Sequence, residues 1–200
     1  MKNCSRRKLL GRNRKGVYHC STRCVRRAYL CGRDPVTKKD FSHRRRWIIN
    51  REEQLAGLFG IEIEFRAEMS NHLHLVLRTR PEVVKRWSNE KVVRRWLTIT
   101  RLAKSMSDSL PSPDPVRFKT LMKSKNEIKR IRRRLSCISW FMSTLCENIA
   151  RRANKEDGTT GRFWEFKCRV STLDYFGLEW PSIVEAPRRG GSRERLIVLF

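Results

Sequence analysis

Two short segments with alternating side chains constrain the fold of this chain more than any other feature. Apolar and charged residues alternate from residue 61 to 68, and a second alternating segment runs from 72 to 77. Successive side chains of a strand point to opposite faces, so each segment predicts a β-strand with one inward face. The short polar link Ser70-Asn71 then predicts an antiparallel hairpin, which places the second strand inside a sheet. The side chains expected to face inward from the first strand are Ile61, Ile63, Phe65 and Ala67, with Glu62, Glu64, Arg66 and Glu68 outward.

The second strand contains two of the four histidines of the chain, His72 and His74, two residues apart. Both imidazoles are therefore expected on one face of the sheet, with Leu73, Leu75 and Leu77 on the other. Two adjacent imidazoles can hold one divalent cation and leave its other positions open for water or phosphate oxygens. Two polar side chains on a solvent-facing sheet face are the other interpretation, which the short spacing favours when it is taken alone.

The charge of the chain points to a polyanion as its partner. Forty-six Lys and Arg against 20 Asp and Glu give a formal net charge of +26. Such an excess favours binding to phosphates through the release of counterions. No stretch approaches the ~20 apolar residues of a membrane span, so we expect no membrane partner and favour nucleic acid. The arginines that their positions make candidates for phosphate contacts are Arg23, Arg26, Arg27, Arg130, Arg133 and Arg134.

The length of 200 residues predicts one well-cored domain rather than two. Residues 1–15 are expected to form a flexible basic arm, and they lack the apolar run of a secretory signal. Residues 16–170 are expected to form the folded domain, whereas glycines and prolines break the pattern in residues 171–200. Seven cysteines without regular spacing indicate reduced thiols in the cytoplasm rather than disulfides or zinc.

Helical patterns separate the expected strands. A helix is expected between Ser42 and Gly60, and a second helical segment begins at Pro81, with Ser88 as a further N-cap. The capping box Ser124-x-x-Glu127 opens the most regular pattern, which predicts one long amphipathic helix. The apolar side chains of that helix recur at intervals of three and four residues, which leaves a coiled-coil homodimer open: Ile128, Ile131, Leu135, Ile138, Met142, Leu145 and Ile149.

Several segments together resemble the HUH single-tyrosine transposases, especially the REP-associated branch. The resemblance runs over roughly residues 14–169 in the order and separation of its motifs. The matching segments are Gly16-Val17-Tyr18-His19, Met69-Ser70-Asn71-His72-Leu73-His74, Asn154-Lys155 and Gly161-Arg162-Phe163-Trp164-Glu165.

The resemblance implies an α+β fold of the ferredoxin-like type, an antiparallel sheet with helices packed on one face. It also implies that His72 and His74 bind Mg²⁺ or Mn²⁺ and that the substrate is single-stranded or hairpin DNA. In that family the metal polarises the scissile phosphate, and a tyrosine attacks it to form a 5′-phosphotyrosine link. The resemblance therefore predicts an enzyme of DNA transposition.

The sequence departs from the family at the nucleophile. The helix that carries the family's tyrosine should follow Phe163-Trp164-Glu165, but no corresponding motif is present there. The chain has three tyrosines, Tyr18, Tyr29 and Tyr175, of which only Tyr175 follows that motif. We therefore take Tyr175 as a candidate, and we hypothesise that the segment after about Cys168 is out of frame or truncated relative to an active ancestor.

Two other functions stay open at this stage. One is a DNA-binding remnant of such a transposase that no longer cleaves DNA. The other is an RNA-binding ferredoxin-like module, which would need exposed aromatic side chains on its sheet. The expected outward residues Glu62, Glu64 and Arg66 do not supply such aromatics, so the sequence favours the DNA readings.

Overall fold

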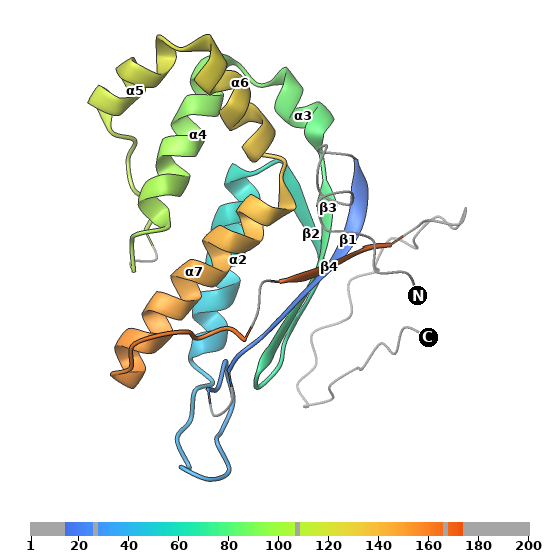
Figure 1. The fold of residues 1–200 in the computed structure, drawn as a ribbon, viewed down its shortest axis with the longest axis vertical. Coiled ribbons are helices and arrows are strands. Elements are labelled where there is room, and N and C mark those ends of the chain that lie inside the picture. Colours follow the sequence, from blue (N-terminus) through green and yellow to red (C-terminus); the bar gives the residue numbers. More distant parts are fainter. Residues whose placement is uncertain (1–14, 26–27, 107–108, 166–167, 174–200) are drawn as a thin grey trace, which may run out of the picture.

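The computed structural model describes residues 15–25, 28–106, 109–165 and 168–173. In these residues the chain is an α+β protein with four strands and six helices (Figure 1). The elements are β1 (Gly16–Arg23), α2 (Arg44–Leu58), β2 (Ile61–Glu68), β3 (His72–Thr79), α3 (Pro81–Arg86), α4 (Asn89–Leu102), α5 (Pro115–Met122), α6 (Lys125–Arg134), α7 (Ile138–Asp157) and β4 (Arg169–Leu173). The predicted α+β class is confirmed.

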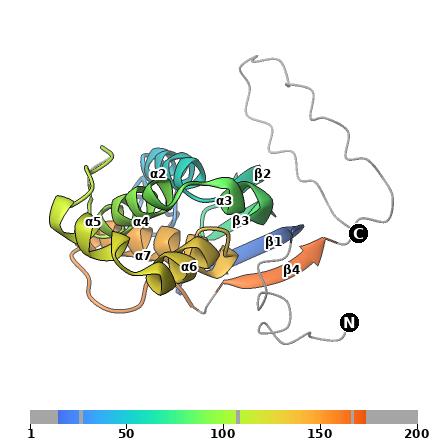
Figure 2. The ribbon, with the colours of Figure 1, turned by 90° about the horizontal axis from the view of Figure 1, so that it is seen from above.

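The strands form one antiparallel sheet in the order β2-β3-β1-β4. The hairpin of β2 and β3 is as predicted, and β3 lies between β2 and β1, which confirms that the histidine strand is internal. The helices lie on one side of this sheet, and the other side is left open by them (Figure 2).

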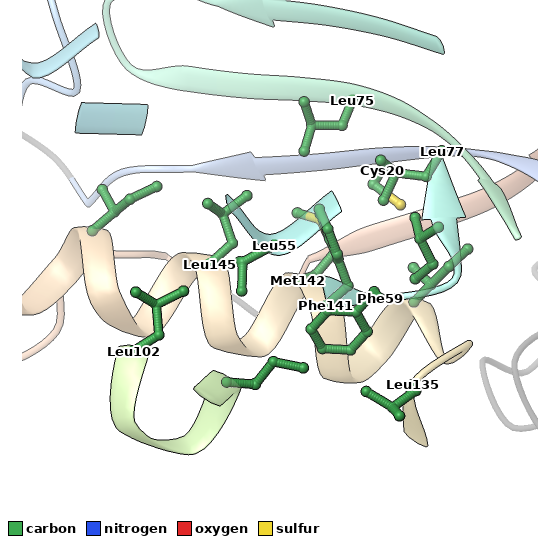
Figure 3. Packing of buried hydrophobic residues seen from close by; sticks show 14 of the residues in the cluster. Cys20, Leu55, Phe59, Leu75, Leu77, Leu102, Leu135, Phe141, Met142 and Leu145 are labelled. Carbon is green, nitrogen blue, oxygen red and sulfur yellow. The ribbon is translucent and has the colours of Figure 1, made fainter. Parts of the chain in front are cut away.

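The core lies between the sheet and the helices. Cys20 of β1 and Leu75 and Leu77 of β3 point toward α2 and α7 (Figure 3), and all three are fully buried. Burial of each of the two leucines stabilises the fold by about 1.5–3 kcal/mol. The opposite side chains of β3, His72 and His74, are only partly buried.

A bulge between Ile63 and Phe65 reverses the predicted alternation in β2. Before the bulge Ile63 pairs with Leu77, which faces the helices, but after it Phe65 pairs with Val76 on the open face. The expected inward positions of Phe65 and Ala67 are therefore wrong. The extra residue of a bulge shifts the side-chain period by one, so that Arg66 instead faces the helices.

The predicted long helix is two helices, α6 and α7, separated at residues 135–137. The carbonyl of Leu135 accepts a hydrogen bond from the backbone N–H of Gly60 (2.7 Å), so it is taken out of the helical pattern. A side chain at Gly60 would collide with Val84 of α3, so glycine is necessary at this position. All seven apolar residues of the predicted stripe are buried within the chain. The stripe therefore serves this fold, and it is not available to a coiled-coil partner.

The end of the domain also differs from the expectation. A strand was expected at residues 162–167, but within its described part only an isolated bridge between Cys24 and Trp164 forms. The fourth strand is β4 instead, which continues the sheet past the expected boundary at residue 170. The arm at residues 1–14 and residues 174–200 lie outside the described residues. None of the described helices is long and apolar enough to cross a membrane.

Candidate metal site on the open sheet face

Three of the four histidines lie on the open face of the sheet. His72 and His74 come from β3, and His19 comes from the neighbouring strand β1, where it pairs with Val76. The ring centroids of His19 and His74 are 5.3 Å apart, and those of His72 and His74 are 5.9 Å apart. The predicted pair is therefore part of a row of three imidazoles on two adjacent strands.

Hydrogen bonds orient the rings of this row. The Nδ1 atom of His72 lies 2.6 Å from Oδ1 of Asn71, and Nδ1 of His74 lies 3.0 Å from Nε2 of His19. A carbonyl oxygen only accepts, so Nδ1 of His72 carries the proton and its Nε2 has a free lone pair. The Nε2 atom of His74 also has a free lone pair when its Nδ1 donates to His19. Partners of this kind orient metal-binding histidines in proteins.

The surroundings of the rings also favour the neutral form. Burial lowers the pKa of His72, and the charge of Arg23 and the neighbouring His74 lower it further. Burial lowers the pKa of His74 as well. The pKa of His19 is lowered by burial and by His74. Neutral imidazole is the form that binds a metal ion.

Two imidazoles supply only part of the ligand shell of a divalent cation. His72 and His74 offer two nitrogen ligands, and oxygen ligands are what Mg²⁺ and Mn²⁺ prefer for the other positions. Among the residues that the structure describes, no three His, Cys, Asp or Glu side chains are placed to share one metal ion. Water and phosphate oxygens would have to complete the shell.

A cleft of about 700 Å³ opens at the end of the β1–β3 pair. Arg23 pairs with His72 in the register and also lies 3.7 Å from the carboxylate of Glu165, which lines the same cleft. The backbone of Glu165 is tied to β1 by a hydrogen bond to the carbonyl of Arg23 (2.8 Å). The residues lining the cleft are Arg23, Cys24, Val25, Ala28, Tyr29, Asp34, Val36, Thr37, Ser70, Asn71 and Glu165.

The three tyrosines have different positions relative to this cleft. Tyr18 is 4% exposed and points toward the helices, away from the histidines. Tyr29 lines the cleft, and its side chain hydrogen-bonds the carboxylate of Asp34. The candidate Tyr175 lies outside the described residues. Of the tyrosines described, only Tyr29 has access to the cleft.

The candidate arginines do not all come together. Arg23 is on the open face with the histidines. Arg130, Arg133 and Arg134 are on α6, which packs against α3, α4 and α5 in the helical layer, so they are not on the histidine face. Arg26 and Arg27 lie outside the described residues.

Three residues of this face were not recognised in the sequence as parts of a site. His19 and Asn71 contact the predicted ligands, but strand register, which a single sequence does not contain, is needed to find His19. Asn71 could have been found, because it directly precedes His72. Phe65 is an aromatic side chain on the open face, which removes the argument that this face lacks aromatics.

In comparisons with known proteins, no family model matches the sequence. Neither a curated protein nor a solved structure matches it.

Proposed function

We propose that the protein is a DNA transposase of the HUH single-tyrosine type that acts on single-stranded or hairpin DNA in the cytoplasm. His72 and His74 are its ligands for Mg²⁺ or Mn²⁺. The observation that supports this most is the orientation of the two rings. His72 donates from Nδ1 to Asn71, and when His74 donates from Nδ1 to His19, both Nε2 atoms are free to bind a cation on the open sheet face.

The chain topology supports a ferredoxin-like fold for this function. The order of elements is strand, helix, two strands, several helices and strand, and the sheet order is β2-β3-β1-β4. A split β-α-β arrangement of this kind places the first and third strands side by side at the centre of the sheet. His19 on β1 and the pair on β3 therefore meet on the two central strands.

The residues of the site have different roles in this proposal. A bound cation would stabilise the negative charge that develops on the scissile phosphate. Arg23, whose side chain is 53% exposed, lies beside His72 and can bind a neighbouring phosphate of the strand. Asn71 and His19 orient His72 and His74.

The nucleophile is a tyrosine, either Tyr29, which lines the cleft, or Tyr175, which lies outside the described residues. Its phenolic oxygen forms the bond to phosphorus, the bond from phosphorus to the 3′ oxygen breaks, and the 3′ oxygen takes up a proton. Tyr29 and Tyr175 are the candidates, because Tyr18 is buried on the other face. The carboxylate of Asp34 accepts a hydrogen bond from the Tyr29 hydroxyl and so orients it.

The alternative is a remnant that binds DNA and does not cleave it. It retains the basic surface and the sheet, and it predicts salt-sensitive DNA binding as the enzyme does. Binding alone therefore does not separate the two functions.

One assay separates them. The protein is incubated with Mn²⁺ and a labelled single-stranded stem-loop, and a covalent protein–DNA adduct is sought on a denaturing gel. We expect an adduct that His72→Ala combined with His74→Ala abolishes, and that either Tyr29→Phe or Tyr175→Phe abolishes. Tyr18→Phe is the matched control, since Tyr18 faces the helices.

An adduct that survives both Tyr29→Phe and Tyr175→Phe would exclude a tyrosine nucleophile at these positions. The absence of any adduct from the wild-type protein, with DNA binding intact, would favour the remnant. Translating the gene in its other two frames after codon 168 tests the origin of the tail. A tyrosine followed by Asn-Pro in one of them would support a frameshift.

A further inference from the structure

A second feature that fits nucleic acid lies in the helical layer, around Arg134 at the end of α6. The Cζ atom of Arg134 lies 4.4 Å from the ring centroid of Trp140 and 5.2 Å from that of Trp96. The two indoles meet edge to face, with centroids 5.3 Å apart. Because the three residues come from α6, α7 and α4, the packing of three helices fixes the guanidinium on the rings.

The hydrogen-bond donors of Arg134 are unused within the described residues. Two positions earlier, Arg132 donates to the carbonyls of Val84 and Trp87 and to Oδ1 of Asn89. Arg134 has neither an ion pair nor a hydrogen bond with any other described residue. A guanidinium offers five N–H donors in a planar fork that suits phosphate, and in the described part of the chain those of Arg134 have no acceptor.

The surroundings of Arg134 are cationic and aromatic. Trp140 is 39% exposed, so part of its indole is accessible to solvent. Arg130, one turn earlier on α6, and Arg133 are both exposed. Burial and the charge of Arg130 lower the pKa of Arg134, so a bound anion would relieve an unfavourable concentration of positive charge.

We propose that Arg134 and Trp140 form a second DNA-contact surface, which binds an unpaired nucleotide by stacking its base on the indole and pairing its phosphate with the guanidinium. Exposed aromatic rings beside basic side chains are the means by which proteins bind single strands without reading their sequence. The surface lies in the helical layer, on the other side of the sheet from the histidine row (Figure 2). This proposal depends on the proposed function only in taking DNA as the partner. It does not depend on DNA cleavage by the protein.

The test is the equilibrium binding of a fluorescently labelled DNA stem-loop with a single-stranded flank to the full chain. We expect Trp140→Leu and Arg134→Gln each to weaken binding about five-fold or more, since loss of one stacked base has at least this effect. Trp140→Phe keeps an aromatic ring and should restore most of the affinity. The control is Arg151→Gln, which removes the same charge from an exposed arginine further along α7. We expect it to change binding less than two-fold.

Equal binding by Arg134→Gln, Trp140→Leu and Arg151→Gln would overturn this proposal and leave the proposed function intact. If Arg134→Gln and Trp140→Leu bind phosphatidylserine vesicles more weakly than the wild type but bind DNA equally well, the proposal would also be overturned, in favour of a lipid surface. Conversely, if the wild-type protein binds DNA through this surface but forms no adduct, only the proposed DNA cleavage would be contradicted. At saturating DNA the surface variants should still form the adduct, and their circular dichroism should match that of the wild type.

Discussion

The two faces of strand β3 divide the properties of the molecule between them. Leu73, Leu75 and Leu77 are fully buried against the helices, whereas His72 and His74 are partly exposed on the open face. The side-chain period of a strand makes this separation unavoidable. A rigid apolar face can therefore fix the positions of two imidazoles without contributing any chemistry. Substitutions on the two faces should affect different measurements.

The largest effect is expected from the buried face. Leu75→Ala removes a fully buried side chain from the core and should lower the free energy of unfolding by about 2–5 kcal/mol. Val76→Ala, one residue along on the open face, is the matched control and should cost less than about 1 kcal/mol. Urea denaturation measures both values. Similar losses for the two variants would mean that the open face is part of a packed interface.

The next effect concerns the histidine row. Mn²⁺ at 100 times its dissociation constant should raise the free energy of unfolding of the wild-type protein by about 2.7 kcal/mol. His19→Ala removes the hydrogen-bond partner of His74 and should weaken metal affinity at least ten-fold, because outer partners have effects of about 10–100-fold. The gain at the same Mn²⁺ concentration should then fall to about 1.4 kcal/mol or less.

Thermal or urea unfolding with and without Mn²⁺ provides the measurement. Ser21→Ala is the control, since Ser21 pairs with His74 in the register but is not a ligand in the proposal. An undiminished gain in His19→Ala would show that His19 does not position the ligand.

The sequence was sufficient to predict the elements whose local pattern agrees with their final environment. The hairpin of β2 and β3, the N-cap of α4 at Ser88 and the buried stripe of α6 and α7 all belong to this group. In each case the deciding interaction lies within a few residues, as in the hydrogen bond from the N–H of Lys91 to the hydroxyl of Ser88 (3.1 Å).

The elements that the sequence did not predict depend on distant partners. The break between α6 and α7 involves Gly60, and the bulge in β2 depends on its pairing with β3. The site shows the same limit. His72 and His74 could be paired from their spacing, whereas His19 joins them only through the register of β1 on β3. Long-range register is not encoded in any local period.

A buried carboxyl on the helical side of β2 should make the free energy of unfolding depend on pH. The bulge places Arg66 3.8 Å from Glu52, a fully buried carboxyl whose oxygens have no hydrogen-bond partner among the described residues. Burial, and then the charge of Glu68, raise the pKa of Glu52 to about 8. Between an unfolded-state pKa of 4.5 and this value, the folded protein holds a proton that the unfolded chain releases. The free energy of unfolding should therefore fall as the pH rises through this window.

Glu52→Gln removes this dependence. At about pH 4 the variant and the wild type should have similar stability, and at about pH 9 the variant should be more stable by roughly 1–3 kcal/mol. Urea denaturation at the two pH values tests this. Glu90→Gln is the control, because the side chain of Glu90 on α4 is 57% exposed and should show no such difference. A gain for Glu52→Gln that does not depend on pH would contradict the buried protonated carboxyl.

The smallest effect is expected from Arg134, in contrast to Arg132. Arg132→Gln leaves the carbonyls at the end of α3 without their donor and should cost about 1–2 kcal/mol of unfolding free energy. Arg134→Gln loses only its contact with the two indoles and should cost about 0.5–1 kcal/mol. Urea denaturation of both variants without DNA decides between two roles for Arg134. If its replacement costs as much as that of Arg132, then Arg134 is part of the helix packing and its open donors are incidental. If the cost is small while DNA binding is weakened, then Arg134 serves DNA binding rather than the packing of the helices.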